Sequence, residues 1–309
     1  MWFIAIIVGI FIINAIFSSN KKKPSATSNF TRQKNPTSNK VNTISKNVFR
    51  TKNKLPDNLI ITDEFKKAFD LLETTNKCAY ITGKAGTGKS TLLTYFRQKT
   101  KKNIIVLAPT GIAAINVEGA TIHSFFRFAP QLIEFQNITK DYTRQDLFNK
   151  VEMIIIDEIS MVRADLLDGI DYSLRKNRNN DAPFGGVQMI FFGDLYQLPP
   201  VVPGKDLLDY FEEHFGGFYF FNAKVFKRIE FDYRELRTIF RQKDESFKDI
   251  LNGIRESSVS IEQLNLLNQR FNPNHTLRSD DVCLTLSTTN KIAEDINRER
   301  MDSLPTKQY

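Results

Sequence analysis

The chain has 309 residues, enough for roughly two domains, and its hydrophobic content of 41% is sufficient for a sizeable core. Two cysteines, Cys78 and Cys283, are too few for a disulfide framework or a zinc site, so we expect a reducing compartment. The net charge of +8 arises within residues 18–56, which hold ten Lys or Arg residues, because 33 basic and 35 acidic residues follow from Asp57 onward. The net positive charge of the whole chain is therefore no evidence that the folded part binds nucleic acid.

Residues 1–17 form an almost uninterrupted apolar run, and three lysines follow it at residues 21–23. As a helix this run would be about 26 Å long at ~1.5 Å per residue, close to the ~30 Å hydrocarbon core of a bilayer. The lysines favour a cytoplasmic position for the rest of the chain. The pattern predicts one N-terminal transmembrane helix that anchors the protein on the cytoplasmic side of the inner membrane. A misassigned start codon or a buried helix is the alternative.

Residues 18–56 are rich in Ser, Asn, Thr and Lys and poor in aliphatic side chains. Such a segment cannot bury enough apolar surface to offset its ordering entropy, so we expect a disordered basic linker. Beside a membrane, the linker would lie on anionic lipid. Weak contact with nucleic acid and a solvated linker without a partner are the two alternatives.

Beyond the linker, short apolar runs alternate with segments of helical pattern. Arg163–Arg178 is such a segment, with Leu166, Leu167, Ile170 and Leu174 on one face. Strand-like runs separated by helices predict an α/β fold with a parallel sheet that is covered on both faces. The expected strands are Cys78–Thr82, Ile104–Ala108, Met153–Ile156, Gln188–Phe192 and Val282–Leu286.

Residues 83–90 have the complete pattern G-x-x-x-x-G-K-S, between an apolar run and a helical segment, Ser90–Gln98. This context is typical of a phosphate-binding loop, whose backbone N–H groups and helix N-terminus attract phosphate. Lys89 would neutralise β- and γ-phosphate charge, and the Ser90 hydroxyl would bind Mg²⁺. A glycine-rich turn with a chance lysine is the alternative. The residues expected to bind the nucleotide are Gly83, Ala85, Gly86, Thr87, Gly88, Lys89, Ser90 and Thr91.

Two carboxylates, Asp157 and Glu158, follow the apolar run Met153–Ile156 directly. Asp157, at the end of this strand, would hold Mg²⁺, and Glu158 would orient and deprotonate the attacking water. Taken alone, an Asp-Glu pair often marks a solvated strand end. Downstream of a phosphate loop and a buried strand, the pair predicts a catalytic site.

Residues 193–200 follow the expected strand Gln188–Phe192 and end in two prolines. Gln197 would hydrogen-bond the γ-phosphate and the attacking water, while Asp194 would support either the metal shell or the loop. Arg241 is our candidate for the cation that stabilises developing charge on the phosphoryl group, reaching across from a second domain. A surface glutamine in a proline-rich turn is the alternative for Gln197.

Taken together, these segments resemble the PIF-type DNA helicases of superfamily 1, which are relatives of RecD. The resemblance extends over residues 60–304 in the order of the family. The matching segments are Ala108–Ala114 (APTGIAA), Gly119–Phe126 (GATIHSFF), Ile156–Met161 (IDEISM), Gly193–Val201 (GDLYQLPPV), Phe240–Gln242 (FRQ) and Thr288–Asn290 (TTN).

The resemblance implies a RecA-like ATPase domain at residues 57–232 and part of a second RecA-like domain at residues 233–309. ATP and Mg²⁺ would bind in the cleft between them. The implied activity is that of an ATP-dependent 5′–3′ DNA helicase, acting on single-stranded and forked DNA in repair, recombination or telomere maintenance.

The resemblance also indicates which residues would hold the DNA strand. Pro109, Thr110, His123 and Ser124 belong to segments that would hold it, with Thr110 and Ser124 donating to phosphates. Phe125 lies in an aromatic and basic cluster with Phe126, Arg127 and Phe128, which is suited to base stacking. Burial of these phenylalanines in the core is the alternative.

Two departures from the family stand out. The stretch Thr62–Lys66 lacks the glutamine with which family members read adenine, and the chain stops at Tyr309, before the family's further strand-gripping motifs. The second departure keeps another class of function open. The chain would then be a membrane-anchored, ATP-dependent DNA-binding module, or a truncated fragment that does not unwind DNA.

Overall fold

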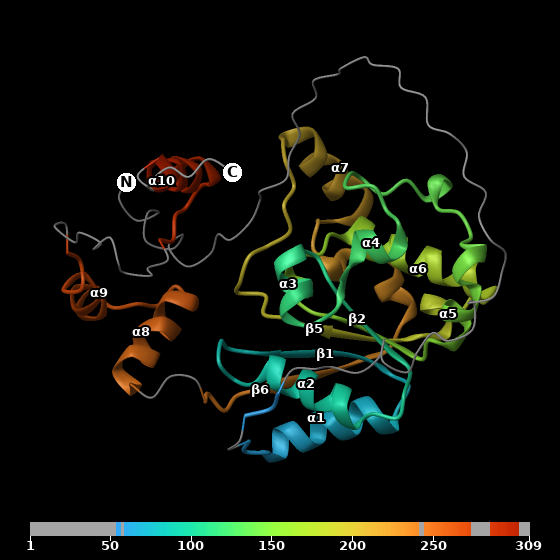
Figure 1. Cartoon of the computed structure of the whole chain (residues 1–309), viewed down its shortest axis with the longest axis horizontal. Helices are drawn as coiled ribbons and strands as arrows, with labels where there is room; N and C mark the ends of the chain where they lie inside the picture. The colour runs from blue at the N-terminus through green and yellow to red at the C-terminus, as the bar shows by residue number, and fades with distance from the viewer. Residues whose placement is uncertain (1–53, 57–58, 241–243, 273–284, 303–309) are drawn as a thin grey trace. The chain divides into compact units, whose positions relative to one another are not determined.

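The structure is a computed structural model, and it describes residues 54–56, 59–240, 244–272 and 285–302 (Figure 1). The described residues divide into two units, one within residues 54–270 and one that comprises residues 271–272 and 285–302. The expected membrane helix at residues 1–17 and nearly all of the basic linker lie outside the described residues. Across the part that the structure describes, no helix combines the length and the apolar character needed to cross a bilayer.

The larger unit is built on a six-stranded sheet in the order β3-β2-β4-β5-β1-β6, with every pair of neighbouring strands parallel. The prediction of a parallel α/β fold is confirmed. Four expected strands are present, whereas most of the fifth, at residues 282–286, lies outside the described residues. The strands are β1 Cys78–Gly83, β2 Ile104–Ala108, β3 Ala120–Thr121, β4 Met153–Ile156, β5 Gln188–Phe192 and β6 Phe231–Leu236.

Helices connect the strands, as parallel pairing requires. The helical pattern over residues 163–178 is confirmed by α6, in which Arg163 is the N-cap. The helices of the larger unit are α1 Asp63–Thr74, α2 Lys89–Lys99, α3 Gly111–Asn116, α4 Ile122–Phe126, α5 Gln145–Lys150, α6 Ala164–Arg178, α7 Lys205–Phe215, α8 Glu245–Arg255 and α9 Ile261–Asn268. In the smaller unit, the structure describes one helix, α10 Asn290–Asp302.

The two faces of the sheet carry separate hydrophobic cores. Successive side chains of a strand point to opposite faces, so Tyr80 belongs to one core and Ile81 to the other. Helices α1 and α2 cover one face, where Phe96 is buried, and helices α4 to α6 cover the other, where Leu167 is buried (Figure 1). Every residue of β2, β4 and β5 is buried, as expected for central strands of a parallel sheet.

The strand register brings three functional segments to one edge of the sheet. Ile81 of β1 pairs with Phe192 of β5, and Ile156 of β4 pairs with Phe191. Since the strands are parallel, the segments that follow them leave from the same edge, which is where open α/β sheets bind ligands. The expected domain boundary between residues 232 and 233 falls within β6, and the division into two domains stays a prediction.

Candidate active site

The loop between β1 and α2 has the backbone of a phosphate cradle. Gly83, Gly86 and Gly88 have φ angles of 152°, 83° and 91°, which side-chain-bearing residues rarely adopt. Thr87 closes the loop, because its N–H and its hydroxyl both donate to the Lys84 carbonyl, at 3.3 and 2.9 Å. No side chain caps the N-terminus of α2, so the N–H groups of its first turn can meet an anion.

Lys89 is the first residue of α2, and its ammonium lies back over this loop. It donates to the carbonyl oxygens of Gly83 at 2.5 Å and Lys84 at 3.3 Å. Burial lowers the pKa of Lys89, and the charges of Asp194, Glu158 and Asp157, in decreasing order, oppose that shift. Three carboxylates therefore lie within electrostatic reach of the ammonium. That the loop and the Asp-Glu pair bind one nucleotide stays a prediction.

Asp157 and Glu158 form the turn that leaves β4. The Asp157 N–H donates to the Leu107 carbonyl at 2.9 Å, and Glu158 takes a left-handed φ of 51°. Burial, and secondly the charge of Glu158, raise the pKa of Asp157 to about 6. Burial also raises the pKa of Glu158, against the charge of Lys89. Two neighbouring half-buried carboxylates with raised pKa values fit a divalent cation, which would relieve their repulsion.

The remaining residues expected to bind the nucleotide differ in their exposure. Ser90 is exposed in the first turn of α2, and Thr91 beside it is half-buried. Ala85 is exposed, whereas Thr87 is buried. The hydroxyl of Ser90 is thus open to a ligand bound at the helix N-terminus.

Asp194 supports the loop that follows β5, one of the two roles expected for it. This carboxylate is 1% exposed, and one of its oxygens, Oδ1, accepts the Tyr196 N–H at 3.1 Å. Its backbone carbonyl accepts the Gln197 N–H at 3.0 Å. Gln197, the candidate for contact with the γ-phosphate, is therefore held in a turn built on Asp194.

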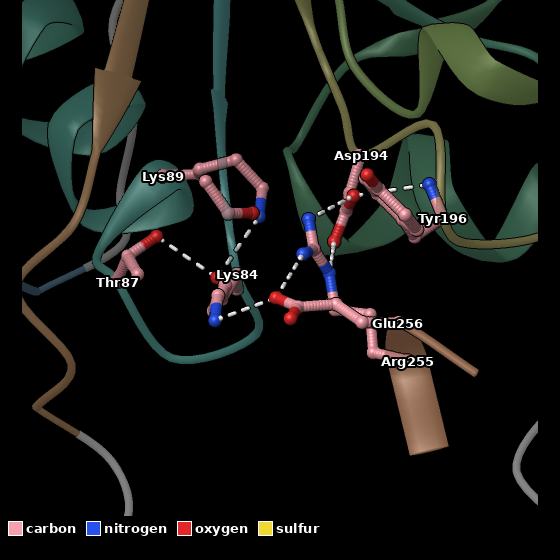
Figure 2. A network of polar contacts seen from close by, with 8 residues as sticks. Lys84, Thr87, Lys89, Asp194, Tyr196, Arg255 and Glu256 are labelled. Carbon is pink, nitrogen blue, oxygen red and sulfur yellow. Dashed lines mark hydrogen bonds and ion pairs between the residues drawn. The ribbon is translucent and has the colours of Figure 1, made fainter. Parts of the chain in front are cut away.

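Sequence reasoning missed Arg255, the last residue of α8. Its guanidinium binds both oxygens of Asp194, with Nη2–Oδ1 at 2.8 Å and Nε–Oδ2 at 3.2 Å (Figure 2). The next residue, Glu256, pairs with Lys84 of the phosphate loop, with Oε1 and Nζ 3.0 Å apart (Figure 2). No motif marks Arg255, and 61 residues separate it from Asp194, so only the fold shows the pair.

Arg241 lies outside the described residues, so its proposed role stays a prediction. Phe240, the residue before it, is described and contacts the phosphate loop. Its N–H donates to the Gly86 carbonyl at 2.9 Å, and its ring would lie 3.9 Å from a Cβ on Gly88.

The segments expected to hold DNA follow β2 and β3, at the same edge of the sheet. The Thr110 hydroxyl caps α3 by accepting the Ala113 N–H at 3.2 Å, and Pro109 before it is half-buried. Ser124 is exposed. His123 is half-buried, and burial together with the charge of Arg163 lowers its pKa. The DNA contacts of these residues stay predictions.

Phe125 requires a correction. It is 9% exposed, and its ring packs edge to face against Phe126 with the centroids 4.8 Å apart. Phe126 is also buried and stacks on Phe128 at 5.3 Å. The expectation that Phe125 stacks on a DNA base is therefore wrong, because the ring is part of the hydrophobic core on one face of the sheet.

The phosphate loop between β1 and α2, with two carboxylates after a neighbouring strand, defines a P-loop nucleotide-binding domain. The PIF1-like helicase family matches residues 60–264, and the chain belongs to this family. The family resemblance found in the motifs is thereby confirmed.

Curated relatives extend well beyond this chain. The ATP-dependent DNA helicase RRM3 of Saccharomyces cerevisiae is 33% identical over 264 residues, which cover 81% of this chain and 35% of the relative. The ATP-dependent DNA helicase PIF1 of Homo sapiens is 32% identical over 238 residues, covering 74% and 35%. The chain thus spans about a third of the length of these two relatives.

Solved structures show the same fold. The Pif1 helicase from Bacteroides in complex with ADP-AlF3 and ssDNA is 40% identical, with a TM-score of 0.73. The match covers 81% of this chain and 59% of that chain. A structure of two coordinating Pif1 helicases unwinding forked dsDNA is 45% identical, with a TM-score of 0.65, over 68% of this chain and 52% of that chain.

Proposed function

We propose that this chain carries the nucleotide site of an ATP-dependent DNA helicase, which hydrolyses ATP to move 5′ to 3′ along single-stranded DNA and separate a duplex. The observation that carries the proposal is that the charges of Asp157 and Glu158 act on the Lys89 ammonium, which lies over the phosphate loop. Support comes from relatives that are named ATP-dependent DNA helicases and from a similar Pif1 structure that contains ADP-AlF3 and ssDNA. By family resemblance, its role would lie in repair, recombination or telomere maintenance.

ATP and Mg²⁺ would bind at the end of β1. The N–H groups of the loop and the Lys89 ammonium would bind the β- and γ-phosphates, and Ser90 and Asp157 would hold Mg²⁺. Within the described residues, no cluster of three or more His, Cys, Asp or Glu residues is placed to hold a metal. A site with one carboxylate, one hydroxyl and phosphate oxygens suits Mg²⁺, which usually binds proteins through one or two carboxylates together with substrate phosphates.

The hydrolytic step would use the carboxylate pair and the loop after β5. Glu158 would orient the attacking water and accept its proton, and Gln197 would hydrogen-bond the water and the γ-phosphate. Arg241 would stabilise charge on the transferred group. The water would give one of its protons to Glu158, its oxygen would bond to the γ-phosphorus, and ADP would leave with the electrons of the broken P–O bond.

Single-stranded DNA and forked DNA are the proposed partners. Thr110 and Ser124, at the ends of β2 and β3, would bind phosphates, which holds a strand without reading its sequence. Pro109 and His123 would shape the same surface. Hydrolysis and strand contact would then occur at one edge of the sheet, where a change at the nucleotide can move the strand-holding loops.

ATP hydrolysis and strand separation by the purified chain test this proposal. We expect single-stranded DNA to stimulate hydrolysis, and a duplex with a single 5′ tail to be separated in preference to one with a single 3′ tail. Lys89→Ala should lower the hydrolysis rate by about 100-fold or more, because it removes a charged donor from the transition state. Lys99→Ala, at an exposed site in the same helix, is the matched control and should retain the rate.

Either of two results would overturn the proposal. One is a Lys89→Ala variant that hydrolyses ATP at the wild-type rate. The other is a wild type that binds single-stranded DNA in the presence of ATP but separates no duplex, in which case the chain would be only an ATP-dependent DNA-binding module.

A further inference from the structure

The end of α8 contacts two different loops of the nucleotide site, and the family motifs do not account for this contact. Arg255 binds both carboxylate oxygens of Asp194, and Glu256 binds Lys84 in the phosphate loop (Figure 2). Arg255 thereby joins α8 to the turn after β5, and Glu256 joins it to the loop after β1. A movement of α8 would act on both loops.

The first consequence of this contact is electrostatic. Asp194 is 1% exposed, so its carboxylate depends on a close cation to offset lost hydration. Arg255 provides that cation, at 2.8 and 3.2 Å. The charge of Asp194 raises the pKa of Lys89 and the charge of Arg255 lowers it, so both groups act on the ammonium. Without Arg255, Asp194 would lose its close cation, and its negative charge would oppose a bound triphosphate more strongly.

The second consequence is geometric. The Arg255 guanidinium lies over the Tyr196 ring at 4.0 Å while it forms a fork with Asp194. Asp194 in turn accepts the N–H groups of Tyr196 and Gln197. Arg255 therefore fixes the beginning and the middle of the turn that presents Gln197. A lysine would keep the charge, but it has neither the planar fork nor the flat face for the ring.

We infer that Arg255 is a positioning residue for ATP hydrolysis. It acts through Asp194 and Tyr196, keeping the negative charge of Asp194 compensated and holding the turn in which Gln197 meets the terminal phosphate. The inference deepens the proposed function and rests on it. Because Arg255 ends α8, it also makes the hydrolytic geometry depend on the position of that helix.

A set of variants in the full chain separates the two effects. Arg255→Gln removes the charge together with the fork and the flat face, whereas Arg255→Lys removes the fork and the flat face but keeps the charge. Arg255→Gln combined with Asp194→Asn removes the charge of both partners. Arg175→Gln is the matched control, since Arg175 binds buried Asp171 at 2.9 Å and lies 5.6 Å from the Tyr172 ring on α6. The control removes a similar contact outside the nucleotide site.

The readouts are the affinities for ADP and for ADP with aluminium fluoride, kcat and KM for ATP, and the melting temperature. Arg255→Gln should lower kcat by about 10- to 100-fold, a loss similar to that caused by removing a residue that orients a metal ligand. It should also weaken binding of ADP with aluminium fluoride, which occupies the γ-phosphate position, more than binding of ADP. Arg255→Lys should have the wild-type KM but a lower kcat. The double variant should recover the affinity for ADP with aluminium fluoride but not kcat.

Three results would overturn the inference. They are wild-type kcat in Arg255→Gln, an equal loss of kcat in Arg175→Gln, and equal weakening of ADP and of ADP with aluminium fluoride in Arg255→Gln. If the wild type binds both nucleotides but hydrolyses no ATP, the proposed function fails. The ratio of the two affinities then still decides the role of Arg255.

Discussion

The Lys89 ammonium donates to the Gly83 carbonyl oxygen at 2.5 Å, across six residues of the loop that joins them. The lysine that would bind phosphate is thus held by the residue at the start of the same loop. Its main-chain acceptors are neutral, whereas a phosphate oxygen carries charge and forms a stronger hydrogen bond. A triphosphate is therefore expected to draw the ammonium from these carbonyls, provided that the backbone at Gly83 keeps its shape.

Gly83→Ala tests that backbone. A Cβ at this position would lie 2.4 Å from the Leu236 carbonyl oxygen and 2.6 Å from the Thr87 hydroxyl, at a φ of +152°. We expect a loss of about 1–3 kcal/mol of unfolding free energy from overpacking, together with weaker ATP binding. Urea denaturation and nucleotide titration measure the two effects.

Gly111→Ala is the control for this substitution. A Cβ at Gly111 meets no atom within 4 Å, and the residue opens α3. Alanine there should leave stability unchanged or raise it by about 0.5–1 kcal/mol, because glycine is the poorer helix former. Equal stability of the two variants would contradict the close packing at Gly83.

Glu158→Gln separates nucleotide binding from hydrolysis. The amide keeps the size of the side chain but cannot take a proton from water, so we expect kcat to fall by about 100-fold or more. The affinity for ATP should stay within a few fold of the wild-type value, or rise, because a negative charge is removed near the phosphates. Single-turnover hydrolysis and nucleotide titration measure the two properties.

Glu152→Gln is the control for Glu158. Glu152 is exposed just before β4, where it accepts the Asn103 N–H at 2.8 Å, and the amide oxygen of glutamine can accept the same bond. This variant should hydrolyse ATP at the wild-type rate. A Glu158→Gln variant as fast as this control would remove Glu158 from the hydrolytic step.

The raised pKa of Asp157 predicts how the free energy of unfolding depends on pH. Its pKa is raised from 3.8 to about 6 by burial and by Glu158. Between these two values the folded state binds more protons than the unfolded state, so stability falls as the pH rises and then stays level above about pH 6. One unit of pKa shift corresponds to about 1.4 kcal/mol, so the loss of unfolding free energy reaches at most about 3 kcal/mol.

Asp157→Asn removes this penalty. The nucleotide-free variant should be more stable than the wild type at pH 7.5, and the gain should disappear as the pH is lowered to 4. Urea denaturation across this range measures it, and a gain that is independent of pH would contradict the raised pKa. In the wild type, affinity for the Mg²⁺-nucleotide complex should fall below about pH 6, because a protonated carboxyl is a poor metal ligand.

Phe125→Ala tests the corrected role of this ring. Loss of a buried phenylalanine should cost about 3–5 kcal/mol of unfolding free energy, whereas Ser124→Ala at the exposed neighbouring site should stay within about 0.5 kcal/mol. Phe125→Leu, which keeps most of the apolar volume, should bind single-stranded DNA as the wild type does. A large loss of DNA affinity in a stable Phe125→Leu variant would restore the stacking role.

The sequence predicted those parts of the fold that leave a local pattern. Strands β1, β2, β4 and β5 are continuous apolar runs because both of their faces are buried, and α6 has a regular apolar stripe. Strand β6 escaped prediction because most of its side chains are exposed or half-buried, so it needs no apolar run. Its sequence, FDYREL, contains three charged residues. Strand β3 has two residues and leaves no pattern.

The residues of the candidate active site differ in the same way in how far they could be predicted. Lys89, Asp157 and Glu158 were predictable because each stands at a fixed offset from a strand that the sequence reveals. Arg255 was not, since its partner lies 61 residues away and the contact depends on where α8 ends. The sequence Phe-Phe-Arg-Phe at residues 125–128 shows an aromatic cluster but not which rings a five-residue helix turns inward.

The composition of β6 also bears on how the sheet meets other chains. An exposed sheet edge offers unpaired N–H and C=O groups to strands of other molecules, and charged side chains hinder such pairing. β6 presents Asp232, Arg234 and Glu235 along one edge, and β3, at the opposite edge, is only two residues long. Both edge strands are therefore poor templates for aggregation, which protects a chain whose central strands are predominantly apolar.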